Sequence, residues 1–412
     1  MRFAHLADVH LGYRQYGSEE RALDFAQAFK KAVEFAEEQN VDFMLIAGDL
    51  FHKKSEMDPV TLAQATVVLE RTGCQVIAVE GNHDSTYFRE RFTWMDYLSS
   101  QGLVVNLKPS FAGGEMEVEE WDGRSGAYID VGDARVYGLK YYGMLTEKIL
   151  DSYLPHVVGD GFTIFMSHFG VEGYMNIYGC INSERLHVHR ERIDYVALGH
   201  IHKKYVEDDF IFNPGSLESC DLNEYRFEKG IFLVEYDGEL SYRHVSSFYR
   251  PRVFRVIELN FEDYSSLRER LLRERGEGKE VVHLRISTDR NIDREKIEGI
   301  ARETLNPLVL RVEVDYSRGV LQATNLSVSS RKEIERSVIS AILKGFGYED
   351  IAEEVLRLKE LFVEGRIEAV DDIVTAIISE KVEEAREELK REEREFETAE
   401  DGEEEWRWWE AG

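Results

Sequence analysis

Acidic, amide and imidazole side chains stand in five short motifs, each directly after a run of apolar residues. Such side chains are hard-to-borderline oxygen and nitrogen ligands, which suit Mn²⁺, Fe or Zn²⁺ better than a thiolate site would. His200 and His202 are two residues apart, as are Asp8 and His10, so each pair shares one face of an extended strand. The five motifs are Asp8-Val9-His10, Gly48-Asp49-Leu50-Phe51-His52, Gly81-Asn82-His83-Asp84, Ser167-His168 and Gly199-His200-Ile201-His202.

The positions of these motifs predict one shared metal site. The carboxyl ends of strands in an open α/β sheet converge on one crevice, so motifs that follow strands lie close together. They offer more ligands than one cation needs, and two cations about 3.5–4 Å apart can clamp the attacking and leaving oxygens of a phosphoryl group. We expect Asp49 to bridge them. His187-Val188-His189 has similar spacing, but it follows neither a glycine turn nor a strong strand, so we leave it out.

Strands and helices alternate over residues 1–245, which predicts an α/β domain. Apolar residues repeat with helical spacing between Ala22 and Ala36. Asp58-Pro59 is typical of a helix start, with Asp as the cap and Pro at the first position, and Gly73 marks its end. The apolar runs expected to be buried strands are 41–47, 75–79, 162–166 and 195–198.

The remainder predicts a small α+β domain and then a helical region. In the α+β domain, residues 250–320, we expect strands at 252–259, 280–287 and 308–315 and helices at 264–273 and 293–305. Residues 325–330 are interpreted as a linker. Residues 331–396 predict a helix–loop–helix, and the acidic, Trp-rich end, 397–412, is expected to be disordered. The apolar stripes of the helix–loop–helix contain Ile351, Val355, Leu358, Phe362, Val370, Ile373, Val374 and Ile377.

The chain has 412 residues and a net charge of −29, which argues against binding a polyanion by bulk charge. Basic residues nevertheless follow three of the motifs, and we expect them to form a local positive rim that contacts a phosphate backbone. A solvated surface is the alternative for each pair. The rim residues are Lys53 and Lys54, Arg89 and Arg91, and Lys203 and Lys204.

The three cysteines, Cys74, Cys180 and Cys220, are widely separated, so neither a disulfide framework nor a cysteine zinc site is expected, and a reducing cytoplasm fits. No stretch approaches the about 18 apolar residues of a membrane-spanning helix, and the charged first residues are unlike a secretory signal. The charge-rich, amide-poor composition is typical of proteins from hot environments.

The ordered set of motifs resembles the calcineurin-like metallophosphoesterases over residues 1–245. Within them, four segments resemble the DNA double-strand-break repair nucleases of the SbcD and meiotic-recombination-eleven type. The four segments are His5–Gly12, Ala47–His52, Leu198–Lys203 and Asn213–Glu218. The resemblance implies a sandwich of two mixed β-sheets flanked by helices, a small DNA-capping domain at 250–320 and a C-terminal helix–loop–helix.

The resemblance also implies roles for individual residues. One metal would be held by Asp8, His10, Asp49 and His202, and the other by Asp49, Asn82, His168 and His200. His83 matches the catalytic histidine that is not a ligand, with Asp84 orienting it. His52 matches a histidine beside the site, and simple packing against Phe51 is its alternative. Two Mn²⁺ per chain are implied, with Mg²⁺ or other divalent metals as alternatives.

The activity implied is 3′ to 5′ exonuclease action on duplex DNA and endonuclease action on single strands and hairpins. The helix–loop–helix would dock onto an SMC-like ABC ATPase, and packing on its own domain is the alternative. A homodimer through helices near 60–72 and 88–100 and a cytoplasmic, nucleoid-associated location without a membrane are also expected. Two other interpretations remain: a small-molecule phosphodiesterase of the same fold, and a mainly structural subunit that bridges two ATPases.

Overall fold

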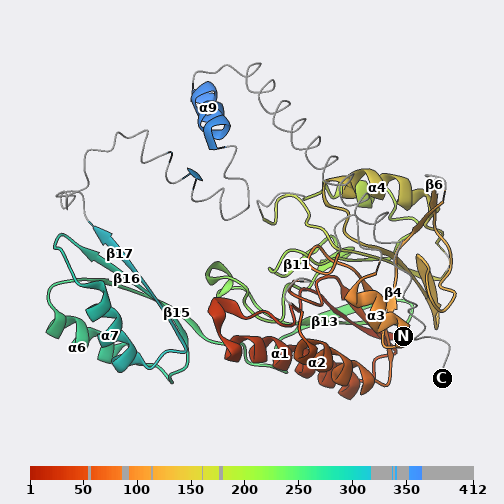
Figure 1. Cartoon of the computed structure of the whole chain (residues 1–412). Helices are drawn as coiled ribbons and strands as arrows, with labels where there is room; N and C mark the ends of the chain where they lie inside the picture. The colour runs from red at the N-terminus through yellow and green to blue at the C-terminus, as the bar shows by residue number, and fades with distance from the viewer. Residues whose placement is uncertain are drawn as a thin grey trace, which may run out of the picture. The chain divides into compact units, whose positions relative to one another are not determined.

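The computed structural model describes residues 1–53, 57–85, 92–112, 115–159, 161–175, 180–316, 336, 339–340 and 352–363. The chain divides into two compact units, Met1–Val320 and Leu321–Gly412, and each is described by itself. The described strands all belong to the first unit, where helices alternate with them along the chain (Figure 1).

A six-stranded mixed sheet carries the first three ligand motifs. Strands β1, β2, β3 and β4 are parallel, β13 pairs antiparallel with β1, and β14 pairs antiparallel with β13. Every residue of β2 is buried, as expected for a strand that is covered on both faces. In sheet order the strands are β14 (Leu240–Val245), β13 (Ile231–Tyr236), β1 (Arg2–Leu6), β2 (Phe43–Ala47), β3 (Gln75–Val79) and β4 (Val105–Asn106).

A second six-stranded mixed sheet carries the other two motifs. Strands β12, β10, β9 and β8 are parallel, and an antiparallel strand closes each edge. In sheet order the strands are β11 (Tyr205–Glu207), β12 (Ile211–Asn213), β10 (Tyr195–Ala197), β9 (Phe162–Ser167), β8 (Ala134–Leu139) and β7 (Tyr128–Val131).

The two sheets pack face to face across one apolar core. Phe3 stacks on Phe43 within the first sheet, with ring centroids 5.0 Å apart, and Tyr195 stacks on Phe212 within the second, at 4.1 Å. The rings of Phe3 and Tyr195 meet edge to face, which joins the sheets. The expected sandwich of two mixed sheets is therefore confirmed.

Helices cover the outer face of each sheet (Figure 1). Asp58 accepts a hydrogen bond from the Thr61 amide at 2.8 Å and Pro59 takes the first helical position, which confirms the expected helix start. The helices on the first sheet are α1 (Glu19–Glu38), α2 (Pro59–Glu70) and α3 (Trp94–Ser100), and those on the second are α4 (Thr146–Tyr153) and α5 (Glu184–His187). The described residues of this part also form a two-stranded ribbon, β5 (Ser110–Ala112) and β6 (Glu115–Glu117), and four 3₁₀ turns, Gln15–Gly17, Gly143–Leu145, Leu154–His156 and Leu222–Glu224.

A three-stranded sheet follows, with its helices in the expected order. All three strands are parallel, so each connection is a β–α–β crossover, and the two helices cover one face. Arg252, just before this sheet, donates to the Asp24 carboxylate of α1 at 2.8 Å. The elements are β15 (Phe254–Asn260), α6 (Tyr264–Arg273), β16 (Val281–Thr288), α7 (Arg294–Leu305) and β17 (Val309–Tyr316).

The second unit is described chiefly through one helix, α9 (Ala352–Val363), where a helix is expected. Val355 and Leu358 on it are half-buried. Among the described residues, no helix combines the length and apolar character needed to cross a membrane. The linker at 325–330, most of 331–396, the tail at 397–412, the side chain of Phe362 and residues Ile351, Val370, Ile373, Val374 and Ile377 lie outside the described part.

Candidate metal centre

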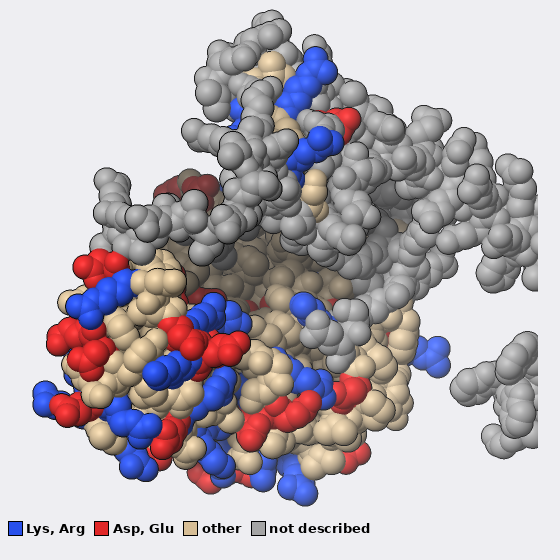
Figure 2. Space-filling view, turned by 60° about the vertical axis from the view of Figure 1, so that its left-hand side comes forward, with Lys and Arg blue, Asp and Glu red and all other residues tan. Residues whose placement is uncertain are grey.

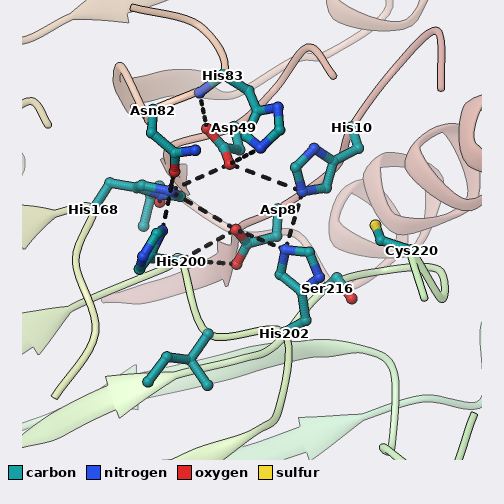
Figure 3. Close-up of polar contacts among 12 residues, drawn as sticks. Asp8, His10, Asp49, Asn82, His83, His168, His200, His202, Ser216 and Cys220 are labelled. Atoms are coloured by element: carbon teal, nitrogen blue, oxygen red, sulfur yellow. Dashed lines mark hydrogen bonds and ion pairs between the residues drawn. The ribbon is translucent and has the colours of Figure 1, made fainter. Parts of the chain in front are cut away.

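Five strands of the two sheets end at one place, and the motif that follows each strand contributes to a single cluster (Figure 3). Asp8, His10, Asp49 and His200 all have positive φ angles, between 52° and 80°, so the chain turns sharply at the strand ends. Such backbone costs about 1–3 kcal/mol per residue and persists only where the surroundings enforce it. Here the amides of Val9 and His10 both donate to the Asp49 carbonyl, at 2.9 and 3.0 Å.

One group of donors comprises Asp8, His10, Asp49 and His202. The Nε2 atoms of His10 and His202 are 3.1 Å apart. His202 Nε2 lies 3.7 Å from Asp8 Oδ1, and His10 Nε2 lies 3.8 Å from Asp49 Oδ2. The four side chains that the resemblance assigns to one metal are therefore brought together.

The second group comprises Asp49, Asn82, His168 and His200. Asn82 Oδ1 lies 3.1 Å from His168 Nε2 and 3.0 Å from His200 Nδ1. Asp49 Oδ2 lies 3.3 Å from His168 Nε2, so the same carboxylate oxygen faces both groups. Asp49 thus lies between the two groups, as a bridging carboxylate would.

The hydrogen bonds of the histidines show that these groups fit cations. His168 Nδ1 donates to the Ala47 carbonyl at 2.8 Å, which leaves a lone pair on Nε2 facing the oxygens of Asn82 and Asp49. His202 Nδ1 lies 2.8 Å from Glu224 Oε1, which likewise turns its Nε2 toward the site. Several electron-pair donors converging in a buried space require a positive charge among them.

Burial and mutual contact shift the ionisation of these groups. Burial raises the pKa of the Asp8 carboxyl. Asp49 is equally buried, yet His168, His10 and His83 lower the pKa of its carboxyl. Burial opposes a proton on His168, but Asp49 and Asp8 outweigh it and raise the pKa of that imidazole to about 9. The two carboxylates are thus stabilised by a positive charge beside them. A divalent cation would supply that charge in place of the proton on His168.

His83 lies at the open edge of the cluster. Its amide donates to Asp49 Oδ1 at 2.8 Å, and its ring Nδ1 contacts the His52 carbonyl. The Nδ1 proton therefore points to that carbonyl, and Nε2, 3.9 Å from Asp49 Oδ2, faces the site. The side chain is 30% exposed, whereas Asp49 is buried, so His83 can meet a substrate.

His52 supports this arrangement from behind. Its ring stacks between Tyr13, at 3.6 Å between centroids, and His83, at 5.1 Å. Its Nδ1 lies 3.4 Å from His10 Nδ1. His52 is thus placed to orient His10 and His83.

Asp84, which is expected to orient His83, contacts backbone amides of the neighbouring loops. Its buried carboxylate accepts backbone amides of Leu50, Phe51 and Gly81, at 3.2, 2.9 and 3.0 Å. Burial and the nearby Asp49 charge raise its pKa to about 7. Asp84 therefore ties the loop after β2 to the loop after β3.

Comparison with known families matches residues 1–204 to the calcineurin-like phosphoesterase family. These residues form a calcineurin-like phosphoesterase domain. The match covers all five motifs of the cluster, so the phosphoesterase domain supplies both groups of donors. The structure of TT1561 of Thermus thermophilus aligns with 59% of this chain and 98% of its own, at a TM-score of 0.35 and 14% identity.

Curated relatives match more of the chain. The DNA double-strand break repair protein Mre11 of Archaeoglobus fulgidus is 37% identical over 54% of this chain and 52% of its own length. Proteins of the same name from Methanocaldococcus jannaschii and Methanopyrus kandleri are each 28% identical, over 70% and 74% of this chain and 77% and 68% of theirs. The chain thus spans about half the length of the first of these relatives.

Part of the expected basic rim of the phosphoesterase domain lies within the described residues. Lys53 and Lys203 are exposed beside the cluster, but Lys204 forms an ion pair with Glu228. Figure 2 shows basic side chains interspersed with acidic ones over the described surface that it presents. Lys54, Arg89 and Arg91 lie outside the described residues.

Sequence reasoning missed Glu224 and Cys220, which reach the cluster from a loop beyond the last motif. No glycine turn or strand-end pattern marks them. The motif glycines themselves were a usable signal, because a Cβ atom on Gly81 would lie 2.1 Å from Asp49 Oδ1 and one on Gly48 would lie 2.2 Å from His168 Nδ1.

Proposed function

We propose that this chain is a two-metal, Mn²⁺-dependent DNA nuclease of double-strand-break repair. The observation that carries the proposal is the Asp49 carboxylate, whose Oδ2 atom faces both donor groups while His83 stands exposed beside it. The relatives that bear the name of a double-strand-break repair protein support DNA as the substrate.

The proposed reaction is hydrolysis of a backbone phosphodiester. When bound, the two cations supply positive charge to the phosphoryl oxygens and lower the pKa of water. Asp8, His10, Asp49 and His202 would hold one, and Asp49, Asn82, His168 and His200 the other. His83 donates its Nε2 proton to the leaving oxygen as the P–O bond breaks. The His52 carbonyl accepts the Nδ1 proton of His83 and so holds the ring in place.

The substrate forms follow from the resemblance. We propose 3′ to 5′ exonuclease action on duplex DNA and endonuclease action on single strands and hairpins, with residues 250–320 as a capping domain. Exposed Lys53 and Lys203 stand beside the cluster and are placed to contact phosphates. Lys204 contributes less, because Glu228 already neutralises its charge.

Two protein partners belong to this proposal. A second copy of the chain would bind helices α2 and α3 and the residues just before α3, where Val60, Val67 and Phe92 are 64%, 44% and 61% exposed. An SMC-like ABC ATPase would bind the helical region at 331–396, of which α9 is described. The apolar stripe of that region supports docking through a helix face.

The test is release of nucleotide from a linear duplex labelled at one 3′ end, with Mn²⁺ against Mg²⁺. Mn²⁺-dependent loss of the label is expected, and His83→Gln should slow it by about 100-fold or more, the contribution of a general acid. A small phosphodiester, bis(4-nitrophenyl) phosphate, is assayed in parallel. Rapid cleavage of the small ester with an intact duplex would contradict the proposal.

A further inference from the structure

Cys220 lies beside the first donor group, although it belongs to none of the five motifs. Its Sγ atom and one ring nitrogen each of His10 and His202 all lie within 4.8 Å of one another. Figure 3 shows Cys220 at the edge of the cluster, on the side of His10 and His202. A nitrogen, nitrogen and sulfur set of this kind differs from the oxygen-rich sets that Mn²⁺ prefers.

One carboxylate holds both Cys220 and His202 in place. Glu224 Oε2 accepts the Cys220 backbone amide at 3.0 Å, and Glu224 Oε1 lies 2.8 Å from His202 Nδ1. Lys229 in turn donates to Glu224 Oε2 at 2.9 Å and to the Ser216 hydroxyl at 2.7 Å. A buried network thus fixes the backbone of Cys220 relative to the imidazole, and the thiol itself lies 3.9 Å from the Glu218 carbonyl.

We propose that Cys220 is an additional donor for the cation position formed by His10 and His202, and that it makes this position favour soft divalent cations such as Zn²⁺ and Cd²⁺. When such a cation binds, the S–H bond breaks, sulfur bonds to the cation and the proton leaves to solvent. Thiolate prefers soft cations, whereas Mn²⁺ is satisfied by the carboxylates and imidazoles alone. The inference rests on the proposed two-cation site and adds a selectivity that the strand-end motifs do not contain.

Co²⁺ is the probe, because sulfur coordination gives it a near-ultraviolet charge-transfer band that nitrogen and oxygen ligands do not. The full chain is titrated with Co²⁺ alone. The wild type should show this band together with visible ligand-field bands. Cys220→Ser should lose the near-ultraviolet band and keep the visible bands, since Glu224 holds residue 220 through its backbone amide.

Cys74→Ser is the matched control. Cys74 is a half-buried cysteine next to Glu37, outside the metal cluster, so this variant should keep both sets of bands. Cd²⁺ affinity should fall by at least about tenfold in Cys220→Ser, the lower limit for loss of a group that supports a metal site. Mn²⁺ affinity should change much less.

The outcomes separate this inference from the proposed function. Visible Co²⁺ bands without the near-ultraviolet band in the wild type, or a band that survives in Cys220→Ser, would overturn the role of Cys220 and leave the two-cation site standing. Failure of the wild type to bind Co²⁺ at all would overturn both.

Discussion

Two parts of this chain are built around parallel strands, but side chains that could bind metal gather at the strand ends in only one of them. Strands β1, β2 and β3 are buried almost throughout, and the side chains of the metal-ligand motifs appear only after the strands end. Strand β16 instead alternates between buried and exposed residues, since helices cover one face of its sheet and leave the other open.

The difference shows what a second covering layer does. In a strand buried on both faces charged groups are costly except at its ends, and five such ends surround one point. A strand with an open face spreads its charges along its length, and Arg285 pairs with Glu258 and Glu313 on the neighbouring strands, at 3.1 and 3.3 Å. The first arrangement concentrates charge and the second neutralises it.

The largest effect expected from this contrast is on catalysis. Asp49→Ala removes the carboxylate that faces both donor groups, so Mn²⁺-dependent duplex cleavage should fall by at least about 100- to 1000-fold, the range for loss of one transition-state-stabilising group. Asp130→Ala, which changes an exposed acid on β7 paired with Arg135, is the control and should retain activity. Comparable losses in both variants would show that the Asp49 carboxylate has no special role in cleavage.

In the three-stranded sheet β15–β16–β17, substitutions should change the free energy of unfolding. Leu284→Ala empties a fully buried position and should cost about 2–5 kcal/mol. Its neighbour Arg285 makes only exposed ion pairs, so Arg285→Ala should stay within about 0.5 kcal/mol. Hydrogen exchange across residues 254–316 measures the stability of both variants. Equal protection in the two would contradict the alternation of buried and exposed residues along β16.

A smaller effect tests the burial of β1. His5 is fully buried between Tyr195 and the Leu198 carbonyl, and burial lowers its pKa to about 3. Below about 6.5 the unfolded chain gains a proton that the folded chain refuses, so stability should fall as pH drops from about 6.5 toward 3, by about 1.4 kcal/mol per unit.

Urea unfolding of the wild type and His5→Gln from pH 4 to 8 isolates this contribution. The two curves should diverge as the pH falls, with the wild type losing more stability. Parallel curves would mean that His5 takes up a proton in the folded state.

The sequence was sufficient to place the strands and donors, because each depends on local signals. An apolar run followed by glycine and a ligand residue marks a buried strand and the turn after it, as at Gly48-Asp49. The cap at Asp58 followed from the same kind of short pattern and is confirmed. That Asp49 bridges two cations stays a prediction, and the position of its Oδ2 atom between the two donor groups supports it.

Other parts of the site depend on long-range packing that leaves no local pattern. His200 meets Asn82 across 118 residues of chain, and only the approach of the two sheets brings them together. Glu224 and Cys220 come from a loop, and Asp84 turns toward backbone amides rather than toward the ring of the adjacent His83. Such contacts are set by the tertiary fold.

The most direct test of the account is the number of Mn²⁺ ions that the chain binds, measured by equilibrium dialysis with electron paramagnetic resonance. The wild type should bind two, with a spin-coupled signal, because one carboxylate oxygen faces both groups. Asp49→Ala should lose the coupling and at least one ion. A single uncoupled ion in the wild type, unchanged in Asp49→Ala, would contradict the shared two-metal centre.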